Sequence, residues 1–210
     1  MSLLSRHFLV AVAGLASGLS SGPAAAEPIS YVILKEGQPI GHETVTIDRQ
    51  GDLTTVQVQT ETRVKVLFLD FHYHHQRVET WRAGRLESMV ADTDDDGAIH
   101  HIEVSHPGQS VRLTVDGTTR ETAGDALPLT LWGKAIIDHG NLYSIVDAEP
   151  YRVTIAALGK STLALGGREM AAEHYRMTGD VDRDLWFGSD GLLLKVAFER
   201  RGYPIEIVRE

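Results

Sequence analysis

Short runs of alternating apolar and polar residues, separated by glycine-bearing turns, constrain this chain more than any other feature of its sequence. The clearest run is TTVQVQTETRVKV, residues 54–66, which places every valine on one face and every charged residue on the other. A period of two is typical of a strand with one buried and one solvated face. Turn sequences such as KEGQP, RAGR, DDDG, VDGT and RRGYP follow one another at short intervals. The sequence therefore predicts an all-β fold, mainly one antiparallel meander of roughly a dozen strands curved into a barrel or half barrel.

The segment DALPLTLWGKAIIDHG departs from this rhythm. Leu127, Leu131 and Ala135 stand at helical spacing, and Pro128 suits the first turn of a helix. We therefore expect one short helix or lid around residues 127–139.

The N-terminal residues have the layout of a secretory signal peptide. Arg6 and His7 form a basic start, a run of apolar and small residues follows, and Ala24–Ala26 supply an A-x-A cleavage site. The apolar run of about 13 residues is shorter than the roughly 20 that a membrane span needs. We expect residues 1–26 to be a cleaved signal peptide. Residues 27–210 should then form a single β-rich domain that is periplasmic and does not span a membrane.

Composition narrows the functional classes. Of 20 basic and 29 acidic residues only Arg6 lies in the predicted leader, so the remaining chain has a formal charge of −10. This balance argues against nucleic acid as a partner, because nucleic acids attract basic patches. The chain has no cysteine, so it can form no disulfide and offers no thiolate ligand or thiol nucleophile. About 180 residues can bury a core large enough to dispense with such cross-links.

The segment DTDDDGAIHHIE, Asp92–Glu103, matches the calcium-loop pattern of an EF-hand. Its flanks read as strands, however, and Asp96–Gly97 is a strong two-residue hairpin signal. A reversal there places Glu103 six residues along the returning strand, about 20 Å from the turn, whereas calcium ligands lie within about 2.6 Å of the ion. We predict a hairpin and expect no calcium site.

The same hairpin predicts a group of histidines. With two-residue loops at the RAGR and DDDG turns, His74, Thr93 and His100 fall in one row of three strands, and His72 falls in the next. Apolar residues further along that face indicate that it is the interior, although a one-residue slip would turn all of them outward. Facing inward, the three histidines could hold zinc or another transition metal, or one could act as a general base. The alternative is that they only line a pocket and bond to carbonyls, Thr93 and water.

Three blocks of sequence resemble a family of proteins. They are G-x-x-I-G at Gly37–Gly41, E-x-W-x-x-G-R-L at Glu79–Leu86 followed by T-x-x-x-G at Thr93–Gly97, and G-D-x-x-x-x-L-W-[FY] at Gly179–Phe187. In these blocks the chain resembles exported bacterial proteins of unknown function, domain-of-unknown-function family 6134, over nearly its whole length after the leader. The resemblance implies a curved half barrel similar to that of periplasmic lipoprotein carriers, which shelters an acyl chain. It implies no catalytic residues, and fold alone does not imply function.

Three functional hypotheses follow. The first is a periplasmic binding or carrier protein that holds a small apolar or amphipathic ligand inside the curved sheet. Its candidate ligand-binding residues are His72, His74, Thr93, His100, Trp132 and Trp186. The second is a metal-dependent or acid–base enzyme that uses His72, His74 and His100, although no nucleophile elbow, P-loop or dinucleotide fingerprint is present. The third is an envelope assembly protein whose sheet edge pairs with a partner protein.

Overall fold

The protein is described by a computed structural model over residues 26–66, 69–106 and 109–210, so the predicted leader lies outside these ranges except for its last residue. Fifteen strands form one sheet. In chain order they are β1 (Ile29–Lys35), β2 (Gln38–Gln50), β3 (Leu53–Val66), β4 (Leu69–Arg82), β5 (Arg85–Asp95), β6 (Ala98–Ser105), β7 (Ser110–Val115), β8 (Thr118–Ala123), β9 (Leu127–Pro128), β10 (Asn141–Tyr143), β11 (Pro150–Leu165), β12 (Arg168–Gly179), β13 (Arg183–Phe187), β14 (Leu193–Arg200) and β15 (Tyr203–Arg209). One 3-10 helix, η1 (Lys134–Ile136), is the helical element of the described ranges.

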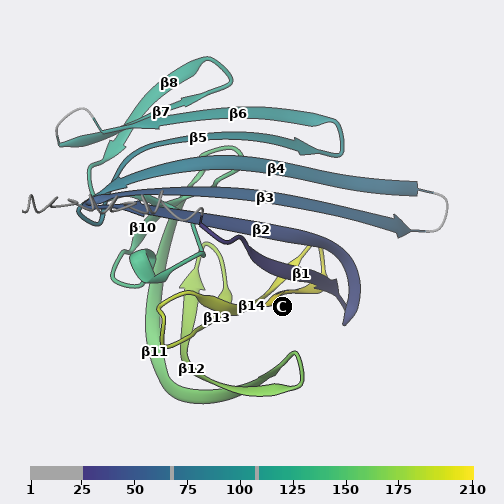
Figure 1. Cartoon of the computed structure of the whole chain (residues 1–210). Coiled ribbons are helices and arrows are strands. Elements are labelled where there is room, and N and C mark those ends of the chain that lie inside the picture. The colour runs from purple at the N-terminus through teal and green to yellow at the C-terminus, as the bar shows by residue number, and fades with distance from the viewer. Residues whose placement is uncertain (1–25, 67–68, 107–108) are drawn as a thin grey trace, which may run out of the picture.

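The connectivity forces the sheet to roll up. The strand order is β8-β7-β6-β5-β4-β3-β2-β1-β15-β14-β13-β12-β11-β10-β9, and all neighbours pair antiparallel except β9 and β10. The two edge strands, β8 and β9, are joined by residues 124–126 alone. Such a link spans at most about 14 Å, so the edges must approach each other. They do not pair, and the roll stays open (Figure 1). The predicted antiparallel half barrel is confirmed.

The hairpin turns account for the regular rhythm of the sequence. At the turn between β5 and β6, Asp96 and Gly97 have φ of 57° and 89°, the left-handed values that a two-residue type I′ turn requires. The hairpin predicted in place of a calcium loop is therefore confirmed. Glu103 lies far along β6, where it pairs with Val90.

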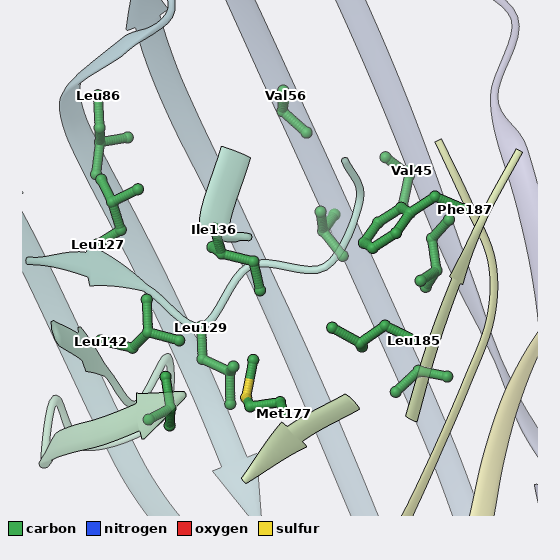
Figure 2. Close-up of a cluster of buried hydrophobic side chains, with 14 of the residues drawn as sticks. Val45, Val56, Leu86, Leu127, Leu129, Ile136, Leu142, Met177, Leu185 and Phe187 are labelled. Atoms are coloured by element: carbon green, nitrogen blue, oxygen red, sulfur yellow. The ribbon is translucent and has the colours of Figure 1, made fainter. Parts of the chain in front are cut away.

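Residues 126–148, here called the interior segment, run through the inside of the roll. The expected helix is reduced to η1, since Leu127 and Pro128 form β9 and pair with β10. All of residues 126–130 are buried, so no single apolar stripe could mark a helix face there. The segment packs against the inner faces of the surrounding strands (Figure 2). The labelled members of this core are Val45, Val56, Leu86, Leu127, Leu129, Ile136, Leu142, Met177, Leu185 and Phe187.

A β-bulge in the β4–β5 hairpin overturns one predicted register. Trp81 pairs with Leu86, as the tight turn dictates, but Thr80 then pairs with Ser88 and skips Glu87. Because of this extra residue, Thr93 lies opposite His75 instead of His74. The predicted row is therefore wrong by one residue in β4, and a one-residue shift moves every side chain of that strand to the other face.

Candidate functional site

A cavity of about 630 Å³ lies between the interior segment and the curved sheet. Its walls are mainly apolar and come from both ends of the chain. They include Ile33, Val64, Phe71, Leu129, Phe198 and Ile207. Cavities of about 300–1,000 Å³ with apolar walls and a few polar groups are the usual sites for small molecules.

Glu43 and Thr60 place a hydrogen-bonded carboxyl in the cavity wall. They lie directly opposite each other on β2 and β3, and the Thr60 hydroxyl donates to Oε2 of Glu43 over 2.8 Å. Burial raises the pKa of Glu43, against the lowering effects of Arg77 and of the Thr60 hydrogen bond. A carboxyl whose neutral form is favoured by burial thus lies in the cavity wall.

Charged residues at one end of the cavity connect two distant hairpins. Asp95, at the end of β5, accepts hydrogen bonds from Arg200 over 2.9 Å and from Arg201 over 3.2 Å. Arg200 also lies over the ring of Tyr73, 5.2 Å from its centroid, and burial raises the pKa of that tyrosine to about 12. The tips of the β5–β6 and β14–β15 hairpins are thereby held together across the roll.

A buried hydrogen-bond network lies on the inner face of β4, centred on Glu79. Oε1 of Glu79 accepts from Arg77 over 2.8 Å and from Thr130 over 2.7 Å. Oε2 accepts from the indole nitrogens of Trp81 over 2.9 Å and Trp132 over 2.8 Å. Glu79 is 0% exposed, yet each of its oxygens has two donors. The network therefore ties the interior segment to the sheet without a free polar group.

His75 extends this network in a defined protonation state. Its Nε2 lies 3.3 Å from Nη1 of Arg77, and its Nδ1 lies 2.8 Å from the hydroxyl of Thr93. Because a guanidinium can only donate, Nε2 must accept and Nδ1 carries the proton that Thr93 receives. Burial, together with the charge of Arg77, lowers the pKa of His75 to about 3. His75 is therefore neutral over the ordinary pH range.

The predicted histidine cluster does not assemble. His72 and His74 lie on the outer face of β4, where His72 is 3.2 Å from Asp94 and His74 is 3.5 Å from Glu61. His100 does pair with Thr93, as predicted, but its ring bonds to Asp116 over 3.0 Å. Across residues 26–66, 69–106 and 109–210 no three His, Asp or Glu side chains are placed to hold a metal ion. The register shift at the bulge is the physical reason that the predicted zinc ligands His72, His74 and His100 stay apart.

The two predicted tryptophan walls have other positions. The indole nitrogen of Trp132 donates to Glu79, and its ring packs edge-to-face on Trp81 with ring centroids 5.8 Å apart. Trp186 stacks on His174 at 4.4 Å on the opposite face of β13 from the buried Leu185. Of the six predicted ligand-binding residues only His72 is among those that border the cavity, although its ring is directed to the outer face, toward Asp94.

Two ionisable residues that border the cavity, Arg183 and Glu43, were not among the predicted site residues. Arg183 has the same parity along β13 as Leu185 and Phe187, which are both 0% exposed. Glu43 likewise lies two residues before Val45 on β2, so the two side chains share a face, and Val45 is 1% exposed. The signal in both cases was an ionisable residue in phase with a buried apolar row.

The fold and cavity define a class: a β-barrel-like protein in which an open, rolled antiparallel sheet encloses an internal segment. The chain belongs to the family described as Domain of unknown function (DUF6134), whose match spans residues 31–210. The family resemblance predicted from the sequence is confirmed. No curated protein matches the sequence. No helix in the described part of the chain has the length and apolar character of a membrane span.

Two solved structures match the chain. A beta-barrel-like protein of domain of unknown function DUF1849 from Brucella abortus matches with a TM-score of 0.64 and 10% sequence identity, covering 89% of this chain and 96% of that one. A DUF1089 family protein from Pseudomonas aeruginosa matches with a TM-score of 0.39 and 13% identity, covering 90% and 95% of the two chains. The first supports the fold alone.

Two family blocks have structural explanations. A Cβ at Gly41 would lie 2.0 Å from the carbonyl oxygen of Glu61, so only glycine allows β2 and β3 to approach there. In the second block, Glu79 and Trp81 are hydrogen-bonded to each other inside the sheet. These blocks specify architecture, and the cavity beside them is the candidate functional site.

Proposed function

We propose that the protein is a periplasmic binding or carrier protein that holds a small apolar or amphipathic molecule in the cavity between the interior segment and the sheet. The cavity itself carries the proposal, because it combines a volume of about 630 Å³ with a wall surface that is mainly apolar. The periplasmic location rests on the predicted signal peptide.

The distribution of core residues supports this proposal. At one end of the roll the interior segment fills the space between the strands with its own leucines and isoleucine. At the other end the same sheet continues, with Val64 and Phe71 facing inward, but no segment of the described chain fills the space between its walls. Apolar surface left open in this way favours an apolar guest, because its removal from water is worth about 25 cal/mol per Å².

Binding of a neutral apolar fluorophore, N-phenyl-1-naphthylamine, tests the proposal. We expect saturable binding to the purified protein, with loss of about tenfold or more in affinity for Ile207→Trp, whose larger ring would fill the cavity. Val208→Trp is the matched control, since its side chain points to the other face of β15. Thermal melting of both variants confirms that they fold. Absence of saturable binding to the parent protein, or equal affinities for the two variants, would contradict the proposal.

A further inference from the structure

Arg183 places a positive charge in the wall of the cavity. Its position on β13 turns it to the same side as the buried Leu185, and it borders the cavity beside Phe198. The guanidinium lies over the Phe198 ring, 4.1 Å from the centroid, and Nη1 donates to the backbone oxygen of Asp182 over 2.8 Å. Stacking on the ring fixes the plane of the guanidinium and leaves its remaining N–H groups without an acceptor from the described residues.

No carboxylate of the described chain forms an ion pair with Arg183, although the charge of Asp182 acts on it from nearby. Every Asp and Glu of the chain lies within the described residues, and none of them forms an ion pair with Arg183. The other two arginines that border the cavity, Arg200 and Arg201, both pair with Asp95. Asp184, the neighbour of Arg183, is engaged by His174 and Arg176 on the outer face.

The guanidinium of Arg183 is a partly buried charge, and burial disfavours its charged form. Burial lowers the pKa of Arg183, and the nearby charge of Arg200 also lowers it, against the raising effects of Tyr151 and Asp182. A partly desolvated charge without a counter-ion costs free energy that an anion bound beside it would recover. Glu43, on β2, does not serve as that anion, since its carboxyl is bonded to Thr60 and burial favours its neutral form.

We propose that the ligand is an amphipathic anion whose carboxylate or phosphate group binds Arg183 and whose apolar body lies along Phe198 and the adjoining wall. This inference rests on the proposed function and adds the charge class of the ligand. A guanidinium presents paired N–H donors that match the two oxygens of such a group. Arg200 and Arg201 contribute less, because Asp95 already occupies them.

The test compares two ligands that differ only in the polar group. Dodecanoate and dodecanol, both below their micelle or solubility limits, compete with N-phenyl-1-naphthylamine for the purified protein. We expect dodecanoate to bind about tenfold or more tightly than dodecanol in the parent protein, and the two to bind equally in Arg183→Met. Arg176→Met is the matched control, since Arg176 lies exposed on the outer face of the neighbouring strand and should leave the preference unchanged.

Each outcome separates this inference from the proposed function. Equal binding of both ligands to the parent protein overturns the inference while the binding function stands. Failure of both ligands to displace the bound fluorophore overturns the inference alone, whereas failure of the fluorophore itself to bind overturns the proposed function as well. A folded Arg183→Met variant that still prefers dodecanoate assigns the anion to another residue and overturns the role of Arg183. Dodecyl phosphate and inorganic phosphate form the final arm: displacement by inorganic phosphate as effective as by dodecyl phosphate identifies a free-anion site and overturns the amphiphile.

Discussion

The rolled sheet has a closed end, which the interior segment fills, and an open end, which holds the cavity. The two ends share the strands β2–β4, but their buried polar groups differ in the hydrogen-bond partners that the protein supplies. At the closed end, Glu79 receives four hydrogen bonds from residues of the sheet and of the interior segment. At the open end, Arg183 has no carboxylate partner and Glu43 is held by Thr60 alone. The difference teaches that a polar residue inside this fold is not in itself a sign of a binding site. The distinguishing sign is a polar group whose partners the protein does not supply.

Removing the central acceptor of the closed end should have the largest effect. Glu79→Ala leaves Arg77 and two indole N–H groups buried without their partner, which we expect to lower the free energy of unfolding by about 3–5 kcal/mol. Urea denaturation at pH 7 measures this. Glu103→Ala, on the outer face of β6, is the control and should cost less than about 1 kcal/mol. Similar losses for the two variants would show that the network does not hold the closed end together.

Acidification should weaken the closed end through His75. Its pKa is about 3 in the folded protein against 6.5 in an unfolded chain, so between these values only the unfolded state takes up the proton. Stability is therefore lost as the pH falls below about 6.5, by about 3 kcal/mol from this group at pH 4. His75→Gln should reduce the loss measured by denaturation at pH 7 and pH 4, whereas His74→Gln on the outer face should not. An unchanged pH dependence in His75→Gln would refute this assignment.

At the open end, Glu43 should produce a smaller effect with the opposite dependence on pH. Burial raises its pKa above the ordinary 4.5, so the unfolded state ionises first as the pH rises. Stability contributed by the neutral carboxyl is lost as the pH rises from about 4.5 through the raised pKa. Glu43→Gln removes this loss and should raise the melting temperature at pH 8 by about 2–4 °C, equivalent to about 1 kcal/mol, but not at pH 4. Thr44→Val, on the opposite face of β2, provides the comparison. An equal gain in the melting temperature of Glu43→Gln at pH 4 and pH 8 would refute the prediction.

Much of the architecture could be read from the sequence because it depends on local rules. Alternation located the strands, and the Asp96–Gly97 turn fixed the pairing of Thr93 with His100. The β4–β5 register could not be fixed in this way, because a bulge adds a residue without changing the turn. Its trace in the sequence is the spacing of Leu86 and Met89, both buried although they stand three residues apart on one strand.

The candidate site was less predictable because its polar residues have partners far away in the chain. Arg77 and Glu79 look like solvent-facing residues until Thr130 and Trp132 are brought over them. Residues 126–130 of the interior segment are all buried, so neither period two nor period 3.6 marks them. Long-range packing therefore decided which charged residues lie inside, and the alternation pattern alone could not.

The pairing of β1 with β15 has a consequence for how the protein is made. Tyr31 lies opposite Arg209, so the middle of the sheet is formed by segments separated by almost the entire chain, while its two margins come from the middle of the sequence. During synthesis, β1 and β14 each have one row of backbone groups unpaired until β15 has been made. Contacts of such long sequence separation form slowly, and open strand edges invite intermolecular pairing in the meantime. Pairing of β15 with both β1 and β14 joins the two halves of the sheet. The same pairing covers the open strand edges and so ends the period in which a nascent chain is prone to aggregate.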